Sequence, residues 1–397
     1  MNKKRLGIIS AIATAVLAAT ALVVPSAHAA GKSLVIWSDE SRAKTLREAA
    51  ASWASKNGVT LTVVIKDFGK VKDEFITAGP KGLGPDLIVG PHDWVGQLAA
   101  SGVLDRMVNI DKSAYAASGI QGFSYKGLLY GLPYNVENVA MFVNTKLSPT
   151  IPTTFADLEK TWASLKAAGT AKVGIEVPYG DPYHHMPLFS GLGGYVFGVG
   201  ASGINAKDLG INSKAFAANA SKVDGYFASG LLSKSSNYDF VQWYAGKAPY
   251  MITGPWNLAN VKKSGIPYAI AAVPAVNGTL SRPFVGVNGF MMSKFAANKI
   301  VARQFLTQVA SSDDFQLALY KLGDRLPALK TAAAKVSDKD VAAFGTYGAT
   351  GTPMPNIPQM NSVWDSWGNA WKNVADGKQT AAAAFAQAAA NIKKAIS

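Results

Sequence analysis

The fold is decided by residues 34–89, which read LVIWSDESRAKTLREAAASWASKNGVTLTVVIKDFGKVKDEFITAGPKGLGPDLIV. The first four residues form a short apolar run, which is typical of a strand buried on both faces of a parallel sheet. A helical pattern follows and ends near Gly58, where the last turn favours a left-handed residue. Residues 59–65 are strand-like, 71–78 helical and 86–89 strand-like again. This order predicts an α/β lobe with helices on both faces of its sheet.

The rest of the chain predicts a second lobe of the same kind. The chain has 397 residues, and single cores stop growing near roughly 250 to 300 residues. A strand at 284–287 and a helix at 299–310 return to the first lobe, and a helix over 380–396 packs through its apolar face. The second lobe is predicted to contain strands at 141–144, 173–177 and 250–252 and helices at 155–168 and 215–229.

The N-terminus has the layout of a secretory signal peptide. Three basic residues precede an apolar stretch over 6–24, and small residues precede a cleavage site after Ala29. Residues 1–29 are therefore predicted to be removed on export to the periplasm or the cell surface. An uncleaved membrane anchor remains the alternative, because the stretch approaches the roughly 20 residues that span a bilayer. The chain has no cysteine, which excludes disulfides and a lipid-modified cysteine.

The charge of the chain is strongly basic, at +14. Without the signal peptide, 36 basic residues face 25 acidic ones, a net charge of +11. Such a balance suits an anionic ligand, nucleic acid or a negatively charged surface. The lysines are scattered, however, without the clusters and interleaved aromatics of a nucleic-acid groove. We interpret them as surface charge and expect no nucleic-acid partner.

Aromatic and acidic residues at predicted turns indicate a carbohydrate site. Trp94 and Trp256 follow strands directly, so their rings are predicted to project outward, whereas Trp53 and Trp162 lie on helical faces and are predicted to be core. Ligands of doubly wound sheets lie beyond the carboxyl ends of strands. Flat rings stack on pyranose faces while carboxylates accept hydroxyl hydrogen bonds. The acidic candidates are Asp39, Glu40, Asp67, Asp93, Glu137 and Asp181.

Enzyme and metal chemistry find little support. A glycosidase needs one carboxylate pair about 5 to 9.5 Å apart, whereas these acids are dispersed over several loops; a secreted glycoside-active enzyme remains an alternative. The chain has no Cys nucleophile, Gly-x-Ser-x-Gly elbow, Walker loop or His-Glu-x-x-His helix. His184 and His185 are adjacent and diverge in any regular structure, so no metal site and no cofactor are expected.

Several segments resemble the maltose/maltodextrin-binding proteins, the sugar-capturing subunits of ABC importers. The most specific is MPNIPQM at 354–360, with Trp364 four residues on. The matches keep family order across essentially the whole mature chain. The others are LVIW at 34–37, GPD at 84–86 followed by HD at 92–93, SG at 101–102, DPY at 181–183 with GGY at 193–195, GPW at 254–256, and RPFVGV at 282–287.

The resemblance implies a two-lobed, periplasmic-binding-protein-like fold of type II, with the ligand cleft between hinge-linked lobes. The implied function is capture of maltose or malto-oligosaccharides by a monomer that delivers them to ABC importer permease subunits. Another oligosaccharide or an anionic sugar remains an alternative ligand. The implied boundaries are 30–136 plus 289–334 for the N-terminal lobe, 140–284 plus 340–397 for the C-terminal lobe, and hinge crossings near 134–140, 285–290 and 334–339.

The resemblance also implies a binding site. Trp256 and Trp364 would stack on glucose rings with Tyr183 as the third aromatic wall. Asp93, Glu137 and Asp181 would accept hydroxyls, and Arg42 would lie near the mouth of the cleft beside Asp39 or Glu40. The full predicted set is Asp39, Glu40, Arg42, Asp67, Asp93, Trp94, Glu137, Asp181, Pro182, Tyr183, Tyr238, Trp256, Met354 and Trp364.

The chain departs from the family pattern at four positions in or near the predicted site. Trp94 stands in place of an Arg, and Gly90 in place of a stacking Trp, so the stacking surface is expected to have moved by four residues. Gly368 replaces another Arg and Leu258 a Trp. These exchanges are expected to alter the preferred chain length or linkage of the ligand.

Overall fold

The computed structural model describes residues 32–200, 203–234 and 237–397. The predicted signal peptide, residues 1–29, lies outside the described residues. Within the part of the chain that is described, no helix combines the length and the hydropathy needed to cross a membrane.

The first sheet is built around the stretch that opened the sequence. Strand β1 (Ser33–Ser38) lies between β2 (Thr60–Ile65) and β3 (Leu87–Pro91), and the three strands are parallel. Helices α1 (Glu40–Lys56) and α2 (Val71–Ala78) connect them. The predicted alternation of strands and helices is therefore confirmed. The seven-stranded sheet has the order β14-β6-β13-β3-β1-β2, with β15 paired to β13.

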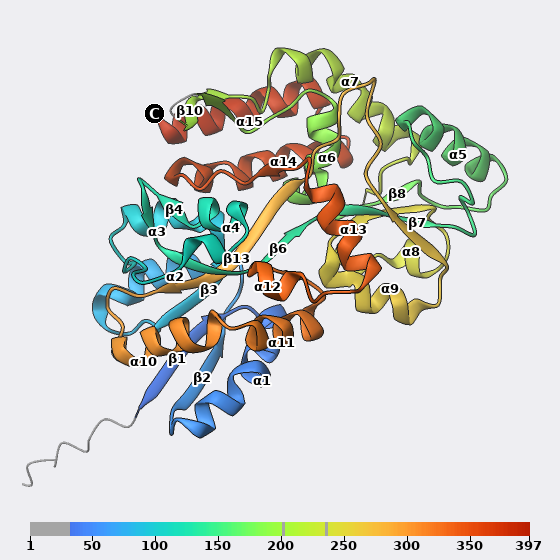
Figure 1. The fold of residues 1–397 in the computed structure, drawn as a ribbon. Helices are drawn as coiled ribbons and strands as arrows, with labels where there is room; N and C mark the ends of the chain where they lie inside the picture. Colours follow the sequence, from blue (N-terminus) through green and yellow to red (C-terminus); the bar gives the residue numbers. More distant parts are fainter. Residues whose placement is uncertain (1–31, 201–202, 235–236) are drawn as a thin grey trace, which may run out of the picture. The chain divides into compact units, whose positions relative to one another are not determined.

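Both faces of this sheet are covered, as its apolar strands require. Leu34 and Ile36 face one core together with α1, α10 and α11, while Trp37 faces another with α2 and α3. Figure 1 shows α10 and α11 on one side of the sheet and α2 and α3 on the other. The predicted helix over 299–310 continues as a π-helical turn after its first half. The bounds here are α3 (Val95–Ala100), α4 (Ala117–Gly122), α10 (Lys299–Gln304), the π-helical η5 (Phe305–Ala310), α11 (Asp313–Gly323) and α12 (Lys330–Ala333).

The second sheet has four strands in the order β12-β7-β11-β8. Met141 and Val143 of β7 face one core, and Phe142 faces another on the opposite side. Trp162 is buried in the first of these cores, as predicted, whereas Trp53 is half-buried at the edge of the first lobe's core. The elements are β7 (Ala140–Asn144), β8 (Ile175–Glu176), β11 (Tyr250–Thr253), β12 (Tyr268–Ala271), α5 (Phe155–Ala167), α6 (Pro182–Gly191), α7 (Lys214–Ser229), α8 (Val241–Tyr244), α9 (Leu258–Ser264) and α13 (Lys339–Gly348).

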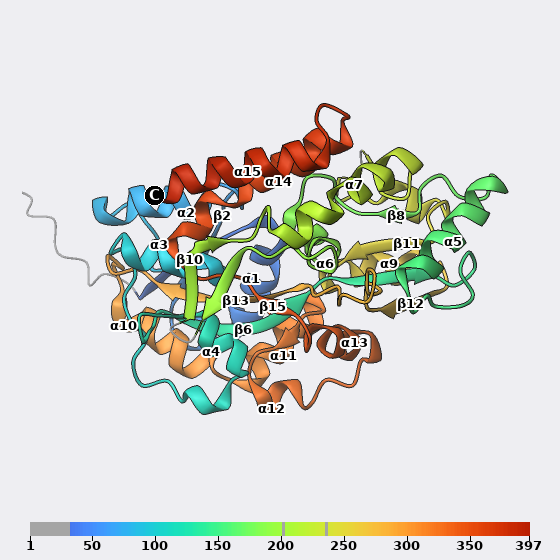
Figure 2. The same ribbon diagram turned by 90° about the horizontal axis from the view of Figure 1, so that it is seen from above.

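Two long strands lie where the chain passes between the sheets. Strand β6 (Gly131–Asn138) continues through Val139 into β7 of the second sheet. Strand β13 (Phe284–Met292) is buried along its whole length and pairs antiparallel with both β6 and β3. Figure 2 shows β13 and β6 side by side. The lobe boundaries and hinge crossings drawn from the sequence stay predictions.

The chain ends in two helices that lie side by side, α14 (Trp364–Ala375) and α15 (Ala381–Ile396) (Figure 2). Phe385 and Ile392 of α15 are fully buried, which confirms the predicted apolar face. The remaining elements are the short strands β4 (Ser124–Tyr125), β5 (Leu128–Leu129), β9 (Phe197–Gly200), β10 (Gly203–Leu209), β14 (Leu326–Pro327) and β15 (Thr352–Pro353), and the 3-10 turns η1 (Gly79–Lys81), η2 (His92–Trp94), η3 (Lys112–Ala114), η4 (Pro255–Asn257) and η6 (Pro358–Ser362).

Candidate functional site

One large cleft of ≈ 1070 Å³ lies beyond the carboxyl ends of strands from both sheets. Asp39 follows β1, Asp93 follows β3 and Trp256 follows β11. All fourteen predicted binding residues line this cleft. The structure thus brings the predicted set together, and the role of that set in binding stays a prediction.

Two tryptophans of the cleft rest directly on backbone glycines. A Cβ atom added to Gly90 would overlap the indole ring of Trp94, and one added to Gly254 would overlap the ring of Trp256. A glycine at both positions therefore lets the ring lie flat on the main chain. The height of each ring in the cleft is set by the backbone.

The prediction that Trp94 projects outward was wrong. Only 7% of Trp94 is exposed, and its ring packs against Val95 and Leu98 in a buried cluster. Phe68 lies over it with a centroid distance of 5.3 Å and an interplanar angle of 40°. The ring turns inward because Gly90 has no side chain, and the indole occupies the space where a Cβ atom would lie. Trp94 therefore belongs both to the cleft wall and to the core.

Substituting Gly90 tests this arrangement. Gly90→Ala is expected to lower the free energy of unfolding by about 1 to 3 kcal/mol, because the new methyl group overpacks the indole of Trp94. Urea unfolding followed by tryptophan fluorescence measures the change. Gly225→Ala on α7 is the matched control, since a Cβ there meets no atom within 4 Å; equal stability of the two variants would contradict the packing argument.

Trp256 is surrounded by other aromatic rings and one cation. It is half-buried, Tyr183 lies 6.1 Å from it between centroids, and the Arg325 guanidinium lies 5.7 Å from its centroid. The Tyr183 hydroxyl is buried and has no hydrogen-bond partner among the described residues. A buried hydroxyl of this kind favours a ligand that supplies the missing hydrogen bond.

Asp93 and Trp364 meet from opposite sides of the cleft. The indole N–H of Trp364 donates to Oδ2 of Asp93 at 3.1 Å, while Oδ1 has no partner within the described chain. Burial raises the pKa of Asp93 to about 6, although Lys72 and the Trp364 hydrogen bond oppose the shift. Lys72 also donates to Asn361 across the cleft.

Arg42 lines the cleft beside Asp39, as predicted, but it lies inside the protein and not at the mouth of the cleft. It is buried, bonds Asp39 Oδ2 at 2.5 Å and donates to Oδ1 of Asn288 on β13 at 2.9 Å. Burial alone would raise the pKa of Asp39, but the charge of Arg42 and hydrogen bonds from Ser41 and Arg42 leave it below its ordinary value. The pairing with a buried carboxylate draws the guanidinium inward, where it ties α1 to the strand β13.

Glu137 is held by a cation that sequence reasoning did not find. Its Oε2 accepts from Nε of Arg325 at 2.6 Å, and both side chains are about nine-tenths buried. The two residues lie 188 positions apart, so no local pattern links them. Arg325 thereby connects the acid predicted to accept hydroxyls with the face of Trp256.

Both carboxylate oxygens of Asp181 already accept hydrogen bonds from protein groups. Oδ1 accepts from the backbone N–H of Tyr183 at 2.8 Å, and Oδ2 accepts from His184 Nδ1 and the Tyr238 hydroxyl, each at 2.6 Å. Burial would raise the pKa of Asp181, but the facing His184 and these hydrogen bonds lower it to about 2. Asp181 is therefore an ionised acceptor that orders its neighbours.

Sequence reasoning did not predict several residues that line the cleft, among them Phe68, Lys72, Arg325 and His184. Phe68 lies in the loop just after β2, which ends at Ile65, and that position was the signal for it. Lys72 and Arg325 carry no local signal. His184 was considered only as a metal ligand. Among the described residues, no group of three or more His, Cys, Asp or Glu side chains gathers as a metal site requires.

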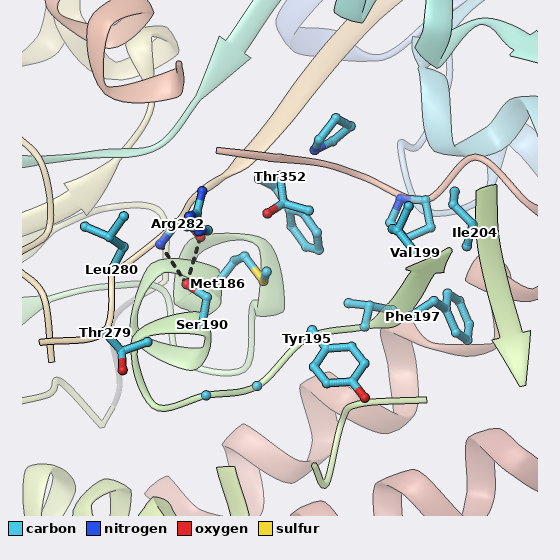
Figure 3. A pocket seen from close by; sticks show the side chains of 16 residues that line it. Met186, Ser190, Tyr195, Phe197, Val199, Ile204, Thr279, Leu280, Arg282 and Thr352 are labelled. Carbon is cyan, nitrogen blue, oxygen red and sulfur yellow. Dashed lines mark hydrogen bonds between the residues drawn. The ribbon is translucent and has the colours of Figure 1, made fainter. Parts of the chain in front are cut away.

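A second, smaller cavity of ≈ 340 Å³ lies beside the paired strands β9 and β10 (Figure 3). Tyr195, Val199 and Leu280 contribute apolar surface to its wall. Ser190 closes its base by hydrogen bonds to the backbone N–H and C=O of Arg282 at 2.7 and 3.0 Å. The cavity contains none of the predicted binding residues.

The two-lobed α/β fold of type II, with a polar and aromatic cleft where its two sheets meet, defines the class of hinged binding proteins. The model of the bacterial extracellular solute-binding protein family matches residues 48–346. The chain belongs to this family. Its members bind solutes and are not enzymes.

Three relatives show how the whole chain compares. A galactooligosaccharide-binding protein of Bacillus subtilis is 31% identical over 91% of this chain and 89% of its own. The maltodextrin-binding protein MdxE of the same organism is 30% identical over 90% and 88%. A maltotriose-binding protein of Pyrococcus abyssi is 28% identical over 76% and 68%.

Proposed function

We propose that this protein captures maltose or malto-oligosaccharides in its cleft and delivers them to the permease subunits of an ABC importer. The observation that carries the proposal is the aromatic lining of the large cleft, with Trp256, Trp364 and Tyr183 beside a set of buried polar atoms. Indole and phenol rings stack on the apolar faces of pyranoses, while polar atoms meet the hydroxyls at the rim.

Buried polar atoms without partners support a ligand rich in hydroxyl groups. Arg42 Nε, Asp93 Oδ1, Tyr183 Oη and His184 Nε2 are buried, belong to cleft residues and have no hydrogen-bond partner among the described residues. An unpaired buried polar group costs about 1 to 3 kcal/mol. A saccharide carries both donors and acceptors, and so it can satisfy all four.

The charge of the cleft argues against the anionic ligand that the basic composition left open. Eight Asp or Glu residues line the cleft, against four Lys or Arg residues. The excess of basic charge therefore lies outside the site. A neutral oligosaccharide fits this environment better than an acidic one, which would meet repelling carboxylates.

Closure of the two lobes is the mechanism we propose. An open form samples closure, and a saccharide that contacts both lobes favours the closed form through its additional contacts. The hydrogen bond from Trp364 to Asp93 spans the cleft and supports this mechanism. The transporter would recognise the closed form of an exported monomer.

Isothermal titration of the mature protein with maltose, maltotriose, trehalose, a cyclodextrin, galacto-oligosaccharide and an acidic oligosaccharide tests the proposal. Saturable binding of maltotriose without release of glucose is the expected result. The relative that binds galacto-oligosaccharide makes that ligand the second candidate. Binding of the acidic oligosaccharide alone, or hydrolysis of maltotriose, would overturn the proposal.

A further inference from the structure

His184 lies at the centre of the aromatic part of the cleft. Its ring meets Trp256 edge to face at 5.6 Å between centroids, Tyr238 at 5.5 Å and Tyr183 at 5.8 Å. It lines the cleft and yet is only 3% exposed. A ligand stacked on Trp256 would therefore lie next to this imidazole.

One nitrogen of the ring is occupied and the other is not. Nδ1 lies 2.6 Å from Oδ2 of Asp181, and an ionised carboxylate only accepts hydrogen bonds, so Nδ1 carries the proton. Nε2 is buried and has no partner among the described residues. The same Asp181 oxygen also accepts from the Tyr238 hydroxyl, which fixes the carboxylate and through it the imidazole.

We propose that His184 is a ligand-binding residue whose Nε2 bonds a hydroxyl of the bound saccharide, and that Asp181 acts through it as a positioning residue. The inference rests on the proposed function and revises the role expected of Asp181. Three hydrogen bonds from protein groups already occupy the two oxygens of Asp181. The carboxylate thus has less capacity to accept a hydroxyl of the ligand.

The chemistry of imidazole selects a hydroxyl as the partner. A neutral imidazole protonated on Nδ1 accepts a hydrogen bond at Nε2, and an imidazolium donates there. A hydroxyl group serves in either case because it is both donor and acceptor. A ligand that lacks the hydroxyl at this point would leave a buried nitrogen unpaired, so His184 discriminates between a sugar and its deoxy analogue.

The neighbouring His185 shows that this placement is specific to His184. Its ring stacks on Trp371 at 4.1 Å between centroids with an interplanar angle of 10°, away from the cleft lining. Burial lowers the pKa of His185 to about 3. One helical step therefore separates a packing imidazole from one at the ligand cleft.

Two substitutions separate the roles of the two ring nitrogens. His184→Asn places its amide near the position of Nδ1 and removes Nε2, whereas His184→Gln places its amide near Nε2. We expect the Asn variant to bind maltotriose about 10-fold more weakly and the Gln variant to stay within about 3-fold of the wild type, because a hydrogen bond of ordinary strength is lost only in the first.

Isothermal titration with maltotriose and with galacto-oligosaccharide measures the affinities, and thermal unfolding without ligand checks the fold of each variant. A ¹⁵N spectrum of the histidine rings adds a direct readout, in which Nε2 of His184 should shift on addition of ligand while His185 does not. Wild-type affinity in a folded Asn variant, or an unmoved Nε2 resonance, would overturn the assignment. Failure of the wild type to bind either saccharide would instead overturn the proposed function and this inference with it.

Discussion

Replacing Trp256 with Ala is expected to weaken maltotriose binding by roughly 30-fold or more, since a buried aromatic anchor of a binding site is worth about 2 kcal/mol and each 1.4 kcal/mol is tenfold. The ring rests on Gly254 and is flanked by Tyr183 and His184. Its removal takes away the surface on which a sugar ring would stack, and it leaves Tyr183 and His184 without one of the rings that they pack against. Isothermal titration gives the affinity directly.

The control for this variant is an exposed aromatic outside the cleft. Tyr195→Ala removes a ring that is 37% exposed beside the second cavity, and it should leave maltotriose affinity unchanged. Trp256→Phe retains a ring and is expected to recover part of the affinity. Unaltered binding by a folded Trp256→Ala variant would contradict the placement of the ligand in the large cleft.

The second large effect is a loss of stability in acid that is traceable to His92. Its Nδ1 accepts from the backbone N–H of Val287 on β13 at 3.1 Å, and its Nε2 donates to the carbonyl oxygen of Met354 at 3.0 Å. Burial lowers the pKa of His92 to about 4, against hydrogen bonds that oppose the shift. The neutral ring thus joins the end of β3 to the long strand and to the cleft wall.

The direction of the effect follows from linkage. The unfolded chain takes up the proton near pH 6.5 and the folded chain only near pH 4, so the contribution of His92 is complete above about pH 6.5 and is lost as the pH falls to 4. At 1.36 kcal/mol per pKa unit the loss is about 3 kcal/mol. Asp93 has the opposite effect on stability: because its pKa is raised in the folded state, its contribution falls as the pH rises towards about 6.

A variant that does not titrate isolates this contribution. His92→Asn keeps an acceptor for the Val287 N–H but has no proton to gain. Urea unfolding of both proteins from pH 7 to pH 4 should show the stability advantage of the wild type shrinking by about 3 kcal/mol across that range. A constant difference between the two proteins would show that the ring does not titrate as its burial requires.

The sequence predicted the lobes' elements well because their apolar periodicity is local. β1, α2 and the buried face of α15 follow from apolar patterns that lie within a few neighbouring residues of the sequence. The gathering of the predicted binding residues in one cleft followed from the rule that ligands lie beyond strand ends, together with the family resemblance. The positions of individual side chains depended on contacts that no local pattern reveals. Arg325 bonds Glu137, 188 positions away in the sequence, and Asp39 holds Arg42 inside the protein. The missing side chain at Gly90 lets the ring of Trp94 turn into the core.

The two glycine-backed indoles also bear on engineering. A ring that rests on main-chain atoms cannot move away to admit a bulkier ligand. Trp94 and Trp256 therefore limit the depth of the cleft. Adjustable surface is supplied instead by Ile65 and Phe68, which line the cleft and are 53% and 49% exposed. A library that aims to retune this receptor as a fluorescent sensor should therefore vary those two positions and leave both glycines untouched.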